Sequence, residues 1–298
     1  MFIVTDSQQS RAVVLRELHK DGVLVLPNAW DAGSAALIAR AGVKAIATTS
    51  GGVSWSQGKP DQQALSRDEM VEQVRRIAAA VELPVTADVE GGYGPAPEDV
   101  AATVEAVIAA GAVGINLEDS KPDFTLFSAD EQAERIRAAR AAAERAGLPE
   151  LVVNLRTDVF LFGIGEEAGR ADDVLARAAV YAEAGADGLF VPGLLDLAVI
   201  AELVEGQPLP VNVMAGPGGA DGGRVRGGRG PPGERGHRRG AGRVHAGAAR
   251  GRGAGDPRQL QRAGRGAGLR HGERRLQPLT RRTVGRRPAG GPVDDRVG

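Results

Sequence analysis

The residues best suited to do chemistry are three acids near the ends of two predicted strands. Asp88 and Glu90 lie two positions apart in VTADVEGGYG, and Glu118 ends the next strand in GINLE. Residues two apart on a strand project to the same face, and neighbouring acids repel unless a cation or protons intervene. Hard oxygen ligands suit Mg²⁺ or Mn²⁺. We therefore predict a divalent-metal site, against the alternative that each acid caps a helix or pairs with an arginine.

Other predicted strand ends carry groups that could hold an anionic substrate. Ser50, Gly51 and Gly52 follow the second strand in TTSGG, where small residues allow backbone N–H groups to approach a carboxylate. Arg156 in NLRTD offers a planar fork for a carboxylate or phosphonate, and Asn212 could add a neutral hydrogen bond. The alternatives are an ordinary turn at TTSGG and an ion pair between Arg156 and Asp158.

The elements that must position these residues alternate between short β-branched runs and Ala-rich amphipathic stretches, the pattern of parallel strands with covering helices. Ser66 and Ser128 suit helix N-caps, and Gly111, Gly147 and Gly185 suit helix ends. We predict strands over 23–28, 45–50, 84–90, 114–118, 151–156, 188–192 and 210–214, and helices that include 66–81, 97–110, 128–146 and 171–185.

The predicted fold class is α/β, of the (β/α)8 TIM-barrel type, with about seven strands present. Barrel enzymes carry their sites at the carboxyl ends of the strands, which is where this sequence becomes polar. A dinucleotide-binding fold is disfavoured because no Gly-rich phosphate loop follows the first strand, and GIGEEAG at 163–169 has the wrong spacing. The chain has no cysteine, which excludes disulfides and thiolate chemistry. Nothing resembles a signal peptide or membrane span, so we expect a cytoplasmic protein without membrane partners.

The net charge of −1 conceals two different segments. Residues 1–217 contain 17 Lys and Arg against 32 Asp and Glu, whereas 218–298 contain 20 Arg against 6 acids. The second segment holds 23 Gly in 81 residues and no Lys, Ile, Phe, Trp, Tyr, Met, Asn or Ser, so it cannot bury enough apolar surface to offset its chain entropy. We predict an incomplete catalytic barrel over 1–217 and a disordered Arg/Gly-rich tail over 218–298 in place of the last βα portion.

This tail suggests a hypothesis about the gene. Its Arg, Gly, Ala and Pro residues have G/C-rich codons, and the residues that it lacks include those with A/T-rich codons, as expected for a frameshift near Gly218 in a GC-rich gene. Seven strands would leave an open edge, so we expect the chain as written to aggregate or to lack activity. The alternative is nucleic-acid binding through the basic tail, which is disfavoured because no aromatic residues are interleaved for base stacking.

Six motifs in order, PNAWDAGSA, TTSGG, GKPD, ADVEGGYG, GINLED and NLRTD, resemble the isocitrate lyase/phosphoenolpyruvate mutase family over about residues 10–216. The resemblance implies that Asp88 binds a metal directly while Asp61, Glu90 and Glu118 hold metal-bound waters. It also implies that Ser50–Gly52 and Arg156 bind the substrate, with Asp88, Glu118 and Arg156 catalytic. A small carboxylate substrate, Mg²⁺ (or Mn²⁺) and a homo-oligomer follow from the same resemblance.

Departures from that family leave the reaction open. Lyase members carry a catalytic cysteine in a loop that reads EDSKPDFTLFSADE here, and strand six ends in FVPG, without the acid or histidine of the two subgroups. The leading hypothesis is a Mg²⁺-dependent lyase-type enzyme that makes or breaks a C–C bond in a small 2-oxo or 2-hydroxy carboxylate through an enolate. The alternatives are P–C or P–O chemistry, as in phosphoenolpyruvate mutases and phosphonopyruvate hydrolases, and a non-catalytic barrel.

Overall fold

The computed structural model describes residues 4–20, 22–215 and 244–247. Contacts between residues divide the chain into two units, 1–252 and 253–298, and all described residues lie in the first. The predicted boundary at residue 217 stays a prediction, and most of the predicted tail lies outside the described residues.

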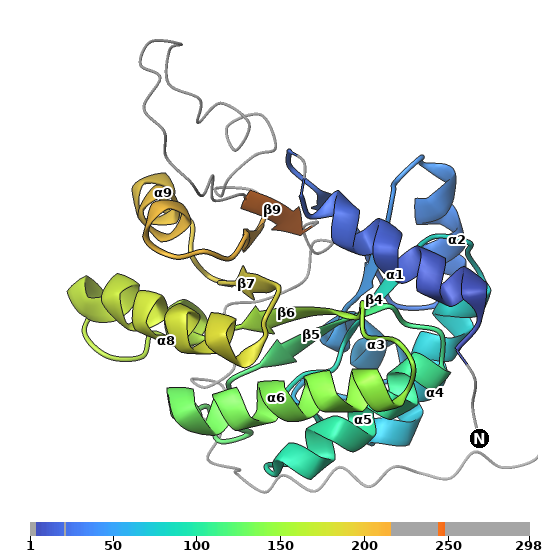
Figure 1. The fold of residues 1–298 in the computed structure, drawn as a ribbon, viewed down its shortest axis with the longest axis horizontal. Coiled ribbons are helices and arrows are strands. Elements are labelled where there is room, and N and C mark those ends of the chain that lie inside the picture. The colour runs from blue at the N-terminus through green and yellow to red at the C-terminus, as the bar shows by residue number, and fades with distance from the viewer. Residues whose placement is uncertain (1–3, 21, 216–243, 248–298) are drawn as a thin grey trace, which may run out of the picture. The chain divides into compact units, whose positions relative to one another are not determined.

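The strands of the described part form one parallel sheet, and each of the seven predicted strands is found within a few residues of its expected place (Figure 1). The first is split in two by Pro27, which lacks the N–H that a continuous ladder needs. The strands are β1 (Val25–Leu26), β2 (Asn28–Ala29), β3 (Ile46–Thr48), β4 (Val85–Asp88), β5 (Gly114–Glu118), β6 (Val152–Arg156), β7 (Gly188–Phe190), β8 (Val211–Met214) and β9 (Val244–Gly247).

The sheet curls back onto its own first strand. Its order is β1-β9-β8-β7-β6-β5-β4-β3-β2, and because β1 and β2 are separated only by Pro27, the two ends of this series meet in one chain segment. This arrangement confirms the predicted TIM-barrel type. It differs from the expected open edge, because β9 pairs with both β8 and β1. The glycine- and arginine-rich composition around residue 244 contains no strand signal, so β9 was not predicted from the sequence.

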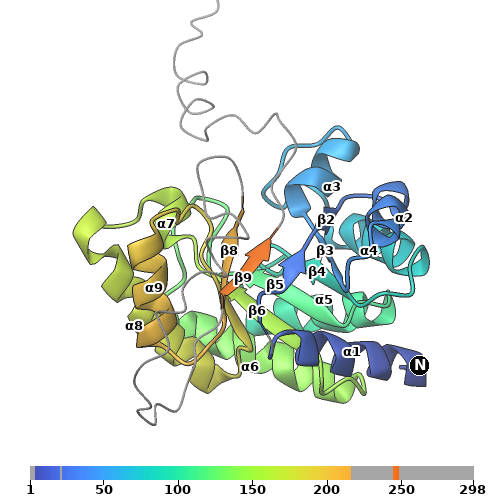
Figure 2. The same cartoon turned by 90° about the horizontal axis from the view of Figure 1, so that it is seen from above.

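Helices cover the outside of the strands, as Figure 2 shows from above. The four predicted helices are confirmed, with Ser66 and Ser128 as N-caps in reciprocal capping boxes and Gly185 as a left-handed C-cap. The helices are α1 (Asp6–Leu18), α2 (Ala32–Arg40), α3 (Ser50–Ser56), α4 (Arg67–Ala79), α5 (Pro97–Ala109), α6 (Ala129–Arg145), α7 (Val159–Phe162), α8 (Arg170–Ala184) and α9 (Leu197–Gly206), with one 3-10 turn, η1 (Glu167–Gly169).

The main core lies between the strands and these helices. Outward-facing strand residues such as Ile115, Leu117 and Val153 are fully buried against α5, α6 and α8. The alternate residues of β5, β6 and β8 point into the barrel and include Asn116, Asn154 and other polar side chains, which remain partly accessible. Alternation along the strands therefore separates an apolar packing layer from a polar interior.

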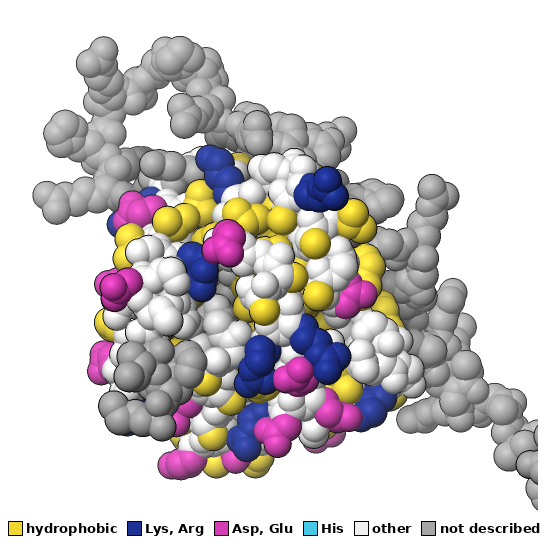
Figure 3. Space-filling view, turned by 90° about the vertical axis from the view of Figure 1, so that its right-hand side faces the viewer, with side chains coloured by type: hydrophobic (Ala, Val, Ile, Leu, Met, Phe, Trp, Pro, Cys, Tyr) yellow, Lys and Arg dark blue, Asp and Glu magenta, His cyan; other side chains and the backbone are white. Residues whose placement is uncertain are grey.

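The face of the molecule drawn in Figure 3 mixes charges of both signs. Lys and Arg side chains alternate with Asp and Glu on the face shown in Figure 3. Within the described part of the chain, no helix combines the length and the apolar character needed to cross a membrane.

Candidate active site

Asp88 ends β4 and is held from both neighbouring strands. Its Oδ2 accepts a hydrogen bond from the backbone N–H of Ser50 at 2.9 Å, and its Oδ1 accepts one from the side-chain amide of Asn116 at 3.2 Å. The backbone N–H of Asp88 donates to the hydroxyl of Thr48 at 2.8 Å. This carboxylate is therefore oriented at the carboxyl edge of the sheet, where a barrel enzyme carries its chemistry.

Glu90 is buried two residues beyond Asp88. Its backbone adopts a φ of +49°, a left-handed conformation that costs energy for a residue with a side chain. Its carboxylate accepts hydrogen bonds from the Tyr93 hydroxyl at 3.0 Å and from the backbone N–H of Gln63. Burial, together with the negative charges of Asp88 and Asp61, raises the pKa of Glu90 to about 7. The site thus concentrates more negative charge than its described partners neutralise.

Glu118 and Arg156 form an ion pair in the barrel. Nη1 of Arg156 lies 2.5 Å from Oε1 of Glu118, while Nε donates to Oδ1 of Asp158 at 2.6 Å. Burial raises the pKa of Glu118 well above its ordinary value, and the charge of Arg156 opposes that rise. Burial by itself lowers the pKa of the Arg156 guanidinium, but Asp158, Glu118 and Asp88 raise it above its usual range. Arg156 is therefore a permanent cation between two acids, and the ion-pair alternative with Asp158 is realised.

The segment predicted as an oxyanion-binding turn is different in the structure. Ser50, Gly51 and Gly52 form the first turn of α3 instead of a loop, and the N–H of Ser50 is occupied by Asp88. A Cβ on Gly51 would lie 2.7 Å from Oδ2 of Asp61, so the glycine allows that carboxylate to approach the helix. This segment therefore lies beside Asp61 and Asp88, in a helical conformation instead of the predicted turn.

Asn212 and the four predicted acids are less closely assembled than predicted. The four acids are Asp61, Asp88, Glu90 and Glu118. Oδ1 of Asn212 is buried and has no hydrogen-bond partner, and no hydrogen bond joins its side chain to the other predicted residues in the described structure. Among the described residues, no three acidic or histidine side chains converge closely enough to enclose a metal ion. Direct ligation by several of these carboxylates therefore does not follow from the geometry.

Several side chains in and around the site were not predicted from the sequence. Asn116 and Asn154 each lie two positions before a recognised residue, Glu118 and Arg156, so they face the same way; this spacing was the available signal. Asp119 is fully buried, accepts from the Tyr181 hydroxyl at 2.9 Å, and has its pKa raised to about 6, mainly by burial. Helical spacing cannot reveal such a contact, because Tyr181 lies 62 residues away.

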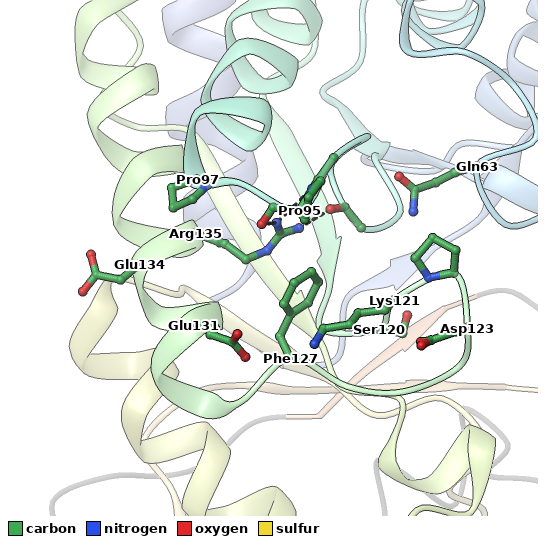
Figure 4. Close-up of a pocket in the computed structure, with 13 residues that line it drawn as sticks. Gln63, Pro95, Pro97, Ser120, Lys121, Asp123, Phe127, Glu131, Glu134 and Arg135 are labelled. Atoms are coloured by element: carbon green, nitrogen blue, oxygen red, sulfur yellow. Dashed lines mark hydrogen bonds between the residues drawn. The ribbon is translucent and has the colours of Figure 1, made fainter.

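A cavity of about 840 Å³ lies beside the loops that follow β4 and β5. Its walls include Gln63, Gly91, Ser120, Lys121 and Arg135 (Figure 4). Gln63 binds Glu90 through its backbone, and the hydroxyl of Ser120 donates to Glu118 at 3.1 Å. The cavity therefore borders residues that hold two of the predicted site acids.

The chain resembles known proteins over most of its length. A sequence model of the phosphoenolpyruvate phosphomutase family matches residues 15–248. The 2-methylisocitrate lyase of Escherichia coli (strain K12) is 32% identical over 203 residues, which cover 65% of this chain and 66% of that enzyme. A candidate phosphonomutase from Burkholderia cenocepacia J2315 is 41% identical, with a TM-score of 0.69 and coverage of 86% of this chain and 95% of that one.

A third similar protein is phosphonopyruvate hydrolase, whose structure was solved with oxalate and Mg²⁺. It is 27% identical, with a TM-score of 0.62, and the similarity covers 68% of this chain and 71% of that one. The family match spans well over half of the chain, and the sheet carries its acids at the expected strand ends. The chain therefore belongs to the phosphoenolpyruvate mutase/isocitrate lyase superfamily, a group of lyases and mutases, and is an enzyme of lyase type.

Proposed function

We propose that this chain uses Mg²⁺, or Mn²⁺ in its place, to make or break a C–C bond in a small 2-oxo or 2-hydroxy carboxylate. The observation that carries the proposal is the fixed Asp88 carboxylate beside the buried acids Glu90 and Glu118. Excess negative charge of this kind is relieved by a cation. The similarity to 2-methylisocitrate lyase supports the reaction class.

The donor set fits a hydrated cation held directly by one carboxylate. Mg²⁺ usually keeps several waters and takes only one or two carboxylates from the protein. We assign the direct contact to Asp88, because both of its oxygens are oriented and it is more accessible than Glu90 and Glu118. Asp61, Glu90 and Glu118 would accept hydrogen bonds from the waters. A bound divalent cation would supply the positive charge that stabilises an enolate oxygen.

The remaining residues bind and orient the substrate in this proposal. Arg156 uses Nε for Asp158 and Nη1 for Glu118, and we assign Nη2 to the carboxylate of the substrate. The buried, unpartnered Oδ1 of Asn212 is an acceptor for a substrate hydroxyl. Gly51 and Gly52 in the first turn of α3 add backbone N–H groups, while the N–H of Ser50 stays bound to Asp88.

The test combines metal dependence with one substitution. We expect Mg²⁺ to raise the melting temperature in the presence of oxalate, and cleavage of 2-methylisocitrate or a related acid, followed by ¹H NMR, to require the metal. Asp88→Ala should abolish both effects, whereas Asp68→Ala, an exposed acid on α4, should preserve them. Metal-independent turnover, or unchanged turnover in Asp88→Ala, would contradict the proposal.

The second candidate acts on a P–C or P–O bond. The family match and the similarity to phosphonopyruvate hydrolase favour it, and it needs the same acids. Incubation with phosphonopyruvate followed by ³¹P NMR separates the two, because only this candidate would consume that compound. Absence of any Mg²⁺-dependent thermal shift, with either compound class, would instead favour a non-catalytic barrel.

A further inference from the structure

Two asparagines extend from the Asp88 carboxylate on β4 along the polar barrel interior, one on the neighbouring strand β5 and one on the next strand, β6. The side-chain amide of Asn116 on β5 donates to Oδ1 of Asp88 at 3.2 Å, and that of Asn154 on β6 donates to Oδ1 of Asn116 at 3.0 Å. The strand register aligns the three residues, since Asp88 pairs with Asn116 and Asn116 with Asn154. The amide pair, Asn116 and Asn154, therefore forms a continuous hydrogen-bonded row with the proposed metal ligand.

The row has a direction. A side-chain amide donates through its NH₂ group and accepts through its oxygen, so the orientation of Asn116 depends on what its two ends meet. Because Asn154 donates to the oxygen of Asn116, the NH₂ group of Asn116 must face Asp88. Reversal of the Asn116 amide would place oxygen against oxygen at Asp88.

The next residue in the row leaves room for this orientation. Asn154 pairs with Gly188 on β7, and a Cβ on Gly188 would lie only 2.8 Å from Oδ1 of Asn154. The glycine thus permits the oxygen of Asn154 to point toward β7, while its NH₂ group points toward Asn116. Neither asparagine carries a charge, so the row adds orientation to the acidic site without adding to its negative charge.

We propose that Asn116 and Asn154 are positioning residues that hold the Asp88 carboxylate in the orientation that binds a divalent cation. This inference rests on the proposed metal dependence and extends it to side chains beyond the acids. Partners of this kind typically contribute roughly 10- to 100-fold to metal affinity. Because the pair acts through the orientation of its amide groups, an added negative charge at residue 154 should weaken the binding of a cation.

The critical variant is Asn154→Asp. The ionised carboxylate that this change introduces only accepts hydrogen bonds, so Asn116 would turn its NH₂ group toward residue 154 and its oxygen toward Asp88. We expect Mn²⁺ affinity to fall about tenfold. Simple charge attraction predicts the opposite, since an added carboxylate should bind a cation more tightly. Asn154→Ala removes the hydrogen bond that orients Asn116 but does not force the Asn116 amide to reverse. This variant should bind Mn²⁺ with an affinity between those of the wild type and Asn154→Asp.

Electron paramagnetic resonance measures the binding of Mn²⁺ to the full chain. The melting temperature of each variant is measured separately, without metal. Gln57→Glu, the same amide-to-acid change at an exposed position, serves as the control and should leave affinity unchanged. Gly188→Ala, which presses on Asn154 from the other side, should also weaken binding.

Three outcomes are distinguishable. Weaker binding in Asn154→Asp than in Asn154→Ala, at similar metal-free stability, supports the proposal. If Asp88→Ala abolishes Mn²⁺ binding but Asn154→Asp binds as tightly as wild type or more tightly, the amide pair has no positioning role, while the metal site stands. If the wild type itself binds no Mn²⁺, the metal site and the role of the pair both fail.

Discussion

Nη1 of Arg156 lies 2.5 Å from Oε1 of Glu118, in an ion pair whose two side chains are each about nine-tenths buried. Arg156 also neutralises Asp158, which is fully buried. Removing one partner from a buried ion pair leaves an uncompensated charge in the interior and destabilises the fold. The contact therefore links the stability of the barrel to the chemistry of the site.

Arg156→Met should destabilise the chain by about 3–5 kcal/mol, because it leaves two buried acids without their cation. Urea unfolding measures this loss. Arg145→Met is the matched control, since Arg145 pairs with Glu105 at an exposed position and its loss should cost no more than about 1 kcal/mol. Equal costs for the two variants would show that the buried charge cluster is not required for stability.

Arg135 holds the loop that follows Asp88 and Glu90. Its guanidinium donates to the backbone carbonyls of Gly91, Gly94 and Pro95, and its Cζ lies 4.1 Å from the centroid of the Phe127 ring. Figure 4 shows this guanidinium between the loop and Phe127.

Arg135→Met should therefore destabilise the fold by at least about 2 kcal/mol, because the buried carbonyl of Gly91 and the part-buried carbonyls of Gly94 and Pro95 lose their donor. The amide hydrogens of residues 91–94 and 96 should exchange faster. Hydrogen exchange with mass spectrometry checks the second point. Arg137→Met, an exposed change on the same helix, should leave that loop unchanged, and a comparable effect there would argue against the assignment.

Tyr181→Phe removes the hydroxyl that donates to Oδ2 of Asp119 at 2.9 Å. Both side chains are fully buried, and Arg177 contacts the same oxygen. We expect a loss of about 1–3 kcal/mol, the cost of a buried polar group left without its partner, measured by thermal or urea unfolding. A neutral substitution would mean that water or Arg177 replaces the hydroxyl.

The N-terminus of α4 should lose stability in acid. Hydrogen bonds from Lys59 and then Ser66 lower the pKa of Glu69 from 4.5 to about 2. Because this folded-state pKa lies below the unfolded value, the ionised form stabilises the fold above about pH 4.5, and the contribution disappears as the pH falls toward 2.

Glu69→Gln should accordingly melt below the wild type at about pH 6, with the difference shrinking between pH 4.5 and 2. Calorimetry at several pH values measures it. Ser66→Ala removes the N-cap hydroxyl that contacts Glu69 and should show the same trend. A difference in melting temperature that stays constant over this range would contradict the assignment.

The sequence by itself determined the positions of the strands and of four long helices, α4, α5, α6 and α8, between residues 45 and 214, because the alternation of apolar residues is a local signal. It also identified the capping serines of α4 and α6, whose partners lie three residues away. The polar ends of the strands were visible too, since parallel strands bring their carboxyl ends to one edge. Family membership followed from motifs in the same order.

Only the tertiary structure decided which groups these residues contact. The ion pair between Arg156 and Glu118 and the row from Asp88 through Asn116 to Asn154 depend on strand register. The contact of the Ser50 N–H with Asp88 joins the first turn of α3 to β4. The partners in that row are 28 and 38 residues apart. The pairing of β9 likewise joins residues far apart in sequence. No local pattern encodes such contacts, because they form only when separate strands are aligned in one sheet.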